Sequence, residues 1–282
     1  MTTRSHLERA NDNAAAHWLG MAAAEGWESR VRPGYTAVRC DRAVTDAHRV
    51  LLTRRPPDAA ALTAELLDLF RGWDTRRLCL EDPYGALDLT GYGCEAALRM
   101  PVMVREAGPQ AGPQTGPQAV AGAGRVAGAP GRASEAVPEV LEAVLEAELA
   151  AVEQAVVEGF PIAAQWPWHR GRMFPPSWSA LPGRRSWLAR RSGATAAACV
   201  SWDDGTSVGL YWVATLPEHR SHGVARALLE AVLRAHPERP AALTATLLGE
   251  PLYRKLGFVE QGLSTWWRYP GQGPAVADSG VG

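Results

Sequence analysis

An arginine, a glycine and an alanine stand at a fixed spacing in the segment VGLYWVATLPEHRSHGVARALL, residues 208–229. Arg220 precedes Gly223 by three residues and Ala225 follows Gly223 by two, which gives the pattern R-x-x-G-x-A. The apolar run before this pattern predicts a strand, and the apolar periodicity after it predicts a helix that begins near Gly223. Free backbone N–H groups at a helix start bind phosphate, and small residues let the phosphate approach the backbone. The spacing therefore indicates pyrophosphate binding.

A second pattern, LYRKLGF, follows at residues 252–258. Its Tyr253 carries a phenol whose ordinary pKa of about 10 lies close to or above the about 8.5 of a thiol. Such a phenol can protonate a departing thiolate at little cost. The alternatives are that Tyr253 is an aromatic residue that packs a helix on a sheet, and that Arg220 is a solvated arginine of a turn.

The two patterns, in this order, resemble the acetyl-CoA-binding signature and the last helix and strand of the GNAT superfamily of N-acetyltransferases. The resemblance covers about 148–268, including the stretch ELAAVEQAVVEGFP. It implies a mixed α/β (α+β) sheet of the GNAT acyl-CoA N-acyltransferase fold, acetyl-CoA as co-substrate without a metal, and direct attack of an amine on the thioester. It assigns Tyr253 as general acid. The implied acetyl-CoA-binding residues are Val213, Ala214 and Thr215 for the pantetheine arm, and Arg220, Ser221, His222, Gly223, Val224, Ala225 and Arg226 around the pyrophosphate.

The general base stays open. Many members of the family place a glutamate on the strand after the long helix, where this sequence reads ALTATLLG and offers Thr244 and Thr246. Nearby in sequence are Glu218, His219, His222 and Tyr211, but water relay or a neutral amine would need no dedicated base. A non-catalytic acyl-CoA-binding or regulatory protein that keeps the fold is therefore the alternative function, and transfer from a longer acyl-CoA is a third.

Composition divides the chain. Residues 107–133 contain three GPQ units and almost no large apolar side chain, which predicts a flexible linker. We expect an α/β domain at 1–106, a linker at 107–135, the GNAT domain at 136–270 and a disordered tail at 271–282. The end of the first region, DLTGYGCEAALRMPVMVR, resembles KLGFVEQGLSTWWRY in layout, so the first domain is either a degenerate tandem GNAT-like domain or an unrelated one. We expect the C-terminal region to bind acetyl-CoA by itself.

Hydrophobic periodicity places the remaining elements. We expect helices at 7–24, 58–70, 140–156, 223–235 and 250–256, although the first residues of the third could form a strand instead. Strands are expected at 35–40, 49–53, 77–80, 99–105, 186–190, 194–202, 208–216, 242–246, near 258 and at 265–269. The aromatic-rich stretch 160–182 lies where the family shapes its acceptor site, and its arginines or their neighbours (Arg170, Arg172, Arg184, Arg185) could favour an acidic acceptor or contact the CoA phosphates.

Charge and composition limit the classes of molecule that this protein is expected to bind. The formal net charge of -1 gives no overall attraction to nucleic acid or membrane. The N-terminus lacks an apolar secretory segment, no stretch is long enough to span a bilayer, and the four cysteines show no CxxC spacing. We therefore expect a cytoplasmic protein with reduced thiols, whose acceptor is a small-molecule amine or a protein N-terminus or lysine. The sequence names neither the acceptor nor the oligomeric state.

Overall fold

The computed structural model describes residues 4–40, 48–73, 78–108, 137–160, 162 and 165–268. All but the first two residues of the expected linker at 107–135 lie outside the described residues, and so does the expected tail at 271–282. The described part of the chain contains no helix long and apolar enough to cross a membrane. All four cysteines are buried.

Both halves of the chain combine helices with strands. The first half contains α1 (His6–Glu25), β1 (Ser29–Val31), β2 (Tyr35–Arg39), β3 (His48–Leu52), α2 (Ala59–Trp73), β4 (Leu78–Asp82) and β5 (Glu95–Arg105). The second half contains β6 (Glu139–Ala143), α3 (Glu146–Gly159), α4 (Pro176–Ser179), β7 (Arg184–Arg191), β8 (Ala194–Asp203), β9 (Val208–Thr215), α5 (Val224–Ala235), β10 (Ala241–Thr244), α6 (Glu250–Lys255) and β11 (Val259–Arg268).

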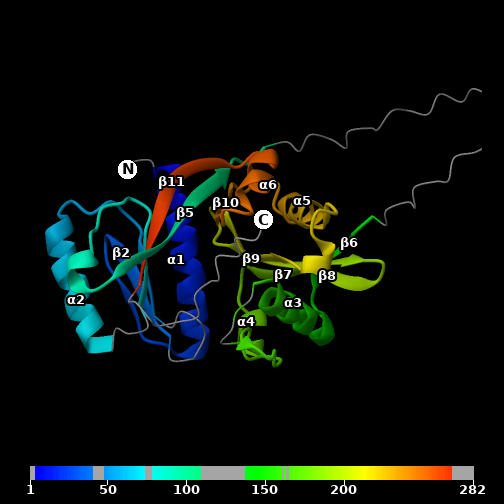
Figure 1. The fold of residues 1–282 in the computed structure, drawn as a ribbon, viewed down its shortest axis with the longest axis horizontal. Helices are drawn as coiled ribbons and strands as arrows, with labels where there is room; N and C mark the ends of the chain where they lie inside the picture. Colours follow the sequence, from blue (N-terminus) through cyan, green and yellow to red (C-terminus); the bar gives the residue numbers. More distant parts are fainter. Residues whose placement is uncertain are drawn as a thin grey trace, which may run out of the picture.

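Both halves share one sheet of eleven strands, in the order β1-β2-β3-β4-β11-β5-β10-β9-β8-β7-β6. The last strand of each half lies among the strands of the other. β11 pairs with β4 and β5 of the first half, and β5 pairs with β10 and β11 of the second. Figure 1 shows β5 and β11 side by side through the middle of the molecule. This exchange revises the expectation that the C-terminal region works by itself, because without the first half β11 has no sheet partner.

The connectivity repeats on either side of the central β11–β5 pair. β3 and β4 are parallel with α2 between them in sequence, and β9 and β10 are parallel with α5 between them. β2 and β8 each pair antiparallel with the next strand. The predicted similarity between the ends of the two regions is present here, since β5 and β11 occupy matching places. The sheet order is therefore that of two tandem α/β units that exchange their last strands.

Helices cover both faces of the sheet (Figure 1). In the second half, α5 packs over Leu210 and Leu243 in one cluster, whereas α3 packs over Leu188 and Ala214 in another. In the first half, α2 packs over β3 and β4 in a cluster that also takes Trp267 from β11. α1 lies on the other face and contacts strands of both halves. The buried cores thus extend across the boundary between the halves.

Two expected elements differ in the structure. The first residues of the expected helix at 140–156 form β6, because they pair with β7, and the helix begins only at Glu146. Glu148 caps this start by accepting N–H groups of Val144 at 3.2 Å and Leu145 at 3.1 Å. The two strands expected near 258 and at 265–269 are one strand, β11, because it pairs with β5 along its whole length through two bulges.

Candidate active site

β9 and β10 separate soon after they meet. Their parallel pairing comprises only Ala241 opposite Val208 and Ala242 opposite Gly209. Beyond these pairs β10 continues with β5 as far as Thr244, while β9 continues with β8 as far as Thr215. The facing edges of β9 and β10 therefore diverge and leave an opening in the sheet.

A bulge in β9 adjoins this opening. Ala198 of β8 lies opposite Ala214 and Val200 lies opposite Tyr211, so β9 holds one extra residue there. Trp212 within the bulge has φ of 54°, a backbone angle that residues other than glycine rarely adopt. Sequence patterns gave no indication of this bulge, because it depends on the register with β8.

The bulge decides which backbone groups of β9 face the opening. The N–H of Leu216 donates to the carbonyl of Ala196 in β8 at 3.0 Å. Because backbone groups alternate in direction along a strand, those of Thr215 and Val213 point the other way, towards the opening. Ala214, which lies opposite Ala198, directs its groups to β8 instead. Of the three residues expected to pair with pantetheine, Val213 and Thr215 therefore turn their backbone groups away from β8, and the Thr215 carbonyl is shared with Arg220.

The start of α5 presents uncapped N–H groups beside the end of β9. Gly223 is the N-cap with φ of 72°, and no side chain caps the helix there. The first bond of the helix runs from the N–H of Ala227 to the carbonyl of Gly223, at 3.0 Å. The N–H groups of Val224, Ala225 and Arg226 hence have no helical acceptor. A Cβ atom on Gly223 would meet nothing within 4 Å, so the space in front of this backbone is open.

Arg220 fastens the turn that leads into α5. Its Nε donates to the carbonyl of Thr215 at 3.2 Å, and its Nη2 donates to the carbonyl of Gly159 at 3.3 Å. It thus ties the end of β9 to the end of α3, where a Cβ on Gly159 would come within 2.9 Å of the Ala214 Cβ. Arg220 is exposed but is bonded to backbone, unlike the solvated arginine considered as the alternative.

The remaining residues of the signature hold the turn or face solvent. Ser221 is exposed and adopts a left-handed φ of 62°. His222 is also exposed, with its Nδ1 2.6 Å from the carbonyl oxygen of Arg220. The Arg226 side chain donates to Glu230 at 2.8 Å, one turn along α5. Val224 is buried and anchors the helix start to the core.

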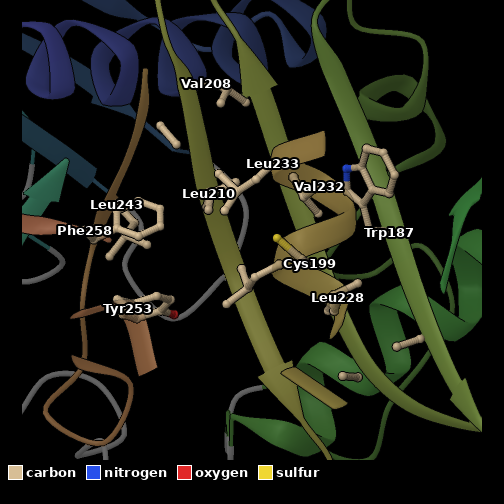
Figure 2. Close-up of a cluster of buried hydrophobic side chains, with 14 of the residues drawn as sticks. Trp187, Cys199, Val208, Leu210, Leu228, Val232, Leu233, Leu243, Tyr253 and Phe258 are labelled. Carbon is tan, nitrogen blue, oxygen red and sulfur yellow. The ribbon is translucent and has the colours of Figure 1, made fainter. Parts of the chain in front are cut away.

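Tyr253 projects from α6 into the space beside β9. Its ring is buried to 7 % exposure and meets Phe258 edge to face, at 5.9 Å between ring centroids. Figure 2 shows its hydroxyl pointing towards β9 and the side of Cys199. Within the described chain this hydroxyl has no hydrogen-bond partner. Burial, and secondarily the nearby Cys199, raise the pKa of Tyr253, so the phenol keeps its proton at neutral pH.

Among the described residues no carboxylate takes the family's usual base position on β10. Glu218 and His222 are exposed, and His219 lies in the same short turn, Pro217–His219. The Tyr211 hydroxyl donates to Asn13 Oδ1 of α1 at 2.7 Å. Asn13 also donates to the carbonyls of Trp202 at 3.2 Å and Ser207 at 3.0 Å. Asn13 thus holds the β8–β9 hairpin from the first half of the chain, a role with no sequence signal.

The aromatic stretch before β7 packs beside the bulge. Phe174 lies 6.2 Å from Trp212 and 6.1 Å from Trp178, between ring centroids. Arg184 is buried beneath them, its guanidinium 5.2 Å from the Phe174 ring centroid. Burial lowers the pKa of Arg184 to about 10.

The other arginines of this region are closer to the surface. Arg170 pairs with Glu146, and Arg185 pairs with Glu142. Arg172 is exposed. In the described part of the chain no cluster of His, Cys, Asp and Glu could hold a metal ion.

Comparisons with known proteins agree with this geometry. Residues 182–260 match the family model described as an acetyltransferase (GNAT) domain. No curated protein matches the sequence. A GCN5-related N-acetyltransferase from Kribbella flavida superposes with a TM-score of 0.63 at 16% identity, covering 95% of this chain and 97% of that one.

Two further solved structures superpose less closely. A GCN5-related N-acetyltransferase from Sphaerobacter thermophilus has a TM-score of 0.54 at 16% identity, over 83% of this chain and 76% of that one. An N-acetyltransferase-like protein from Streptococcus suis 89/1591 has a TM-score of 0.53 at 13% identity, over 93% and 99%. At such identities the likeness concerns the fold. Residues 182–260 thus match the GNAT acetyltransferase family model, and the chain as a whole has the fold of GNAT proteins.

Proposed function

We propose that this protein is an acetyl-CoA-dependent N-acetyltransferase that acts on an amine. The observation that carries the proposal is the opening between β9 and β10, with the uncapped start of α5 at one end and the Tyr253 hydroxyl beside it. The acceptor is a small-molecule amine or the amine of a protein N-terminus or lysine. The family match supports this class of activity.

The residues present fit acetyl-CoA. The backbone groups of Val213 and Thr215 that face away from β8 suit the peptide-like donors and acceptors of a pantetheine arm, with the Thr215 carbonyl shared with Arg220. The open space before Gly223 and the free N–H groups of α5 suit a pyrophosphate, whose charge the helix dipole stabilises. Arg220 keeps these two parts of the site in fixed relation by bonding both sides of the turn.

The chemistry is direct transfer. The amine nitrogen forms a bond to the acetyl carbon while the C–S bond breaks and its electron pair stays on sulfur. Tyr253 donates its proton to that sulfur. The nitrogen then releases a proton to solvent, and the phenolate of Tyr253 takes a proton from solvent. The raised pKa of Tyr253 keeps the proton donor intact below pH 10. A falling limb of activity between pH 7 and 10 is therefore not expected from Tyr253.

A thiol-release assay with acetyl-CoA across a panel of amines tests the proposal. The parent protein should release thiol only when an amine is present. Tyr253→Phe should lower turnover by about 10²–10⁴-fold with acetyl-CoA affinity nearly unchanged, as for loss of a general acid. Tyr92→Phe, at a half-exposed tyrosine outside the site, is the matched control and should keep parental turnover. Turnover of Tyr253→Phe within a few-fold of parent would make Tyr253 a packing residue.

A further inference from the structure

One carboxylate of α3 is buried and binds the backbone of the aromatic stretch before β7. Glu153 is 2% exposed. Its Oε1 accepts the N–H groups of Met173 at 2.7 Å and Phe174 at 2.9 Å. Its Oε2 accepts the N–H of Gly171 at 2.7 Å. Hydrogen bonds to a buried charged group are shorter and stronger than those between neutral groups, so Glu153 fastens this segment to α3.

Phe174 is also held by a second buried charge, of opposite sign. The guanidinium of Arg184 lies 5.2 Å from the centroid of the Phe174 ring. Its Nη1 donates to Ser186 Oγ at 2.9 Å, and the described chain gives it no carboxylate partner. Attraction between a guanidinium and an aromatic ring increases when both are removed from water. The backbone of Phe174 is thus fixed by a carboxylate and its ring by a guanidinium.

Phe174 in turn supports the indole of Trp212 in the bulge of β9. The two rings meet at 6.2 Å between centroids, with 62° between their planes. Phe160 meets the same indole edge to face, also at 6.2 Å. Phe160 directly follows α3, and its N–H donates to the carbonyl of Val156 at 2.9 Å. Both phenyl rings beside Trp212 are therefore attached to α3, one through the chain and one through Glu153.

The support matters because Trp212 has an unfavourable backbone angle. Its φ of 54° persists only where surrounding contacts hold it. The bulge at this position turns the backbone groups of Val213 and Thr215 away from β8. If Trp212 relaxed to an ordinary φ, the register beyond it would change and these groups would change direction. The contacts of Trp212 thus determine what β9 presents to the opening.

We propose that Glu153 is a positioning residue, which holds Trp212 in the bulge through Phe174. It thereby keeps the backbone of Val213 and Thr215 turned towards the opening. The inference rests on the proposed function, because a pantetheine arm is what these backbone groups would bind. Glu153 takes no part in the transfer of the proton or of the acetyl group.

An NMR measurement tests the conformational role without any cofactor. In protein labelled with 15N-tryptophan, Trp212→Phe identifies the Trp212 backbone amide signal by its loss. Glu153→Gln keeps the size of the side chain but replaces an acceptor oxygen with an NH2 group, so the Trp212 signal should shift. Glu158→Gln is the matched control, because the Glu158 carboxylate accepts from Gln154 within α3 at 2.7 Å. An unmoved Trp212 signal in folded Glu153→Gln would overturn the inference.

Acetyl-CoA binding and kinetics test the consequence for the site. Glu153→Gln should raise the Kd and KM for acetyl-CoA by about tenfold or more, because bonds to a charged group are lost. The value of kcat at saturation should stay within about threefold, since bound pantetheine itself selects the bulged conformation. Glu158→Gln should match the parent in both. A general structural defect would lower kcat as well, and a parental Kd in folded Glu153→Gln contradicts the role.

A second variant gives a test even if Glu153→Gln does not fold. Phe174→Leu removes the ring beside Trp212 but keeps the backbone N–H that Glu153 accepts. It should raise the Kd for acetyl-CoA, whereas Tyr92→Leu, at a half-exposed ring of the first half, should not. In the double variant of Glu153 and Phe174 the two effects should combine to less than their product, because they act through one contact. A parental Kd for Phe174→Leu, or effects that multiply fully, would count against the inference.

The two readouts separate this inference from the proposed function. If the parent neither binds acetyl-CoA nor releases thiol while the Trp212 signal shifts in Glu153→Gln, the acetyl-transfer proposal fails and the positioning of the bulge stands. If the parent transfers acetyl groups while Glu153→Gln leaves the Trp212 signal and the Kd unchanged, only the role of Glu153 fails.

Discussion

At position 223 the backbone has φ of 72°, which glycine adopts without steric cost, and the space in front of it is open. A side chain there would add both backbone strain and bulk. Asparagine separates the two effects, because it tolerates left-handed φ while filling the space. We expect Gly223→Val to abolish acetyl-CoA binding and Gly223→Asn to weaken it by about tenfold or more, the equivalent of about 1.4 kcal/mol. Isothermal titration calorimetry measures both.

The matched control is Gly193, in the turn between β7 and β8. It has φ of 81°, and a Cβ there would meet nothing within 4 Å. Gly193→Asn should bind acetyl-CoA like the parent, because this turn lies away from the α5 start. If Gly223→Asn binds as tightly as Gly193→Asn, phosphate does not approach the backbone at position 223.

His17 provides a pH-dependent test of the contact between α1 and β9. The ring is 2% exposed and stacks on Tyr211 at 4.0 Å between centroids. Burial first, then the charges of Arg184 and Arg49, lower the pKa of His17 to about 3. In the unfolded chain His17 has an ordinary histidine pKa of about 6.5, so below that pH the unfolded chain binds a proton that the native state does not bind. Stability should therefore fall as pH decreases from about 6.5 towards about 3.

The expected size is about 1.4 kcal/mol per pH unit, so about 2 kcal/mol is lost between pH 6.5 and pH 5 through this group. His17→Phe keeps an aromatic ring but cannot titrate. Urea unfolding at pH 7 and pH 5 should show a smaller loss for His17→Phe than for the parent, whereas exposed His169→Phe should match the parent. Equal losses for His17→Phe and the parent would mean that His17 is protonated in the native state.

The two equivalent helices, α5 and α2, differ at their starts. At α2 the Asp58 carboxylate accepts the N–H of Ala61 at 3.0 Å, so the start is already occupied by a negative group. A carboxylate there repels phosphate, while the uncapped start of α5 attracts it. We expect one acetyl-CoA per intact chain. Calorimetric stoichiometry tests this, and Gly223→Val should reduce it to none. Two molecules bound per chain would contradict the assignment of a single cofactor site.

The exchange of β5 and β11 makes the two halves depend on each other for folding. Trp267 of β11 is 6% exposed within the α2 core, and Met103 of β5 is fully buried in the α5 core. Residues 134–282 alone would leave Trp267 without its core and β11 without a partner. Burying one large apolar side chain contributes about 1.5–3 kcal/mol, a sizeable part of the stability of a domain.

We therefore expect residues 134–282 expressed alone to lack cooperative unfolding and acetyl-CoA binding. Co-expression with residues 1–108 should restore both, and the two pieces should elute together in size-exclusion chromatography. Residues 1–108 with β5 deleted serve as the control. Co-expression of this piece should restore neither cooperative unfolding nor acetyl-CoA binding. A lone 134–282 fragment that unfolds cooperatively and binds acetyl-CoA would show that strand exchange is dispensable.

The sequence by itself determined the parts of the site that are local. Arg220, Gly223 and Ala225 act through a strand end, a turn and a helix start that are contiguous in the chain, so their spacing predicts their geometry. The helix with Tyr253 is likewise local. The GNAT fold was predicted from these motifs, and the family match and superpositions confirm it. The roles of the individual site residues stay predictions.

Only the tertiary structure decided which strands are neighbours. Alternation of apolar residues assigns faces of a strand but not its partners, and Arg268 pairs with Glu95 from the other half of the chain. The bulge at Trp212 arises from register with β8, and the Asn13 bonds arise from the docking of α1. Glu81 and Thr244 lie far apart in sequence, and the shared sheet brings both to the lining of one pocket.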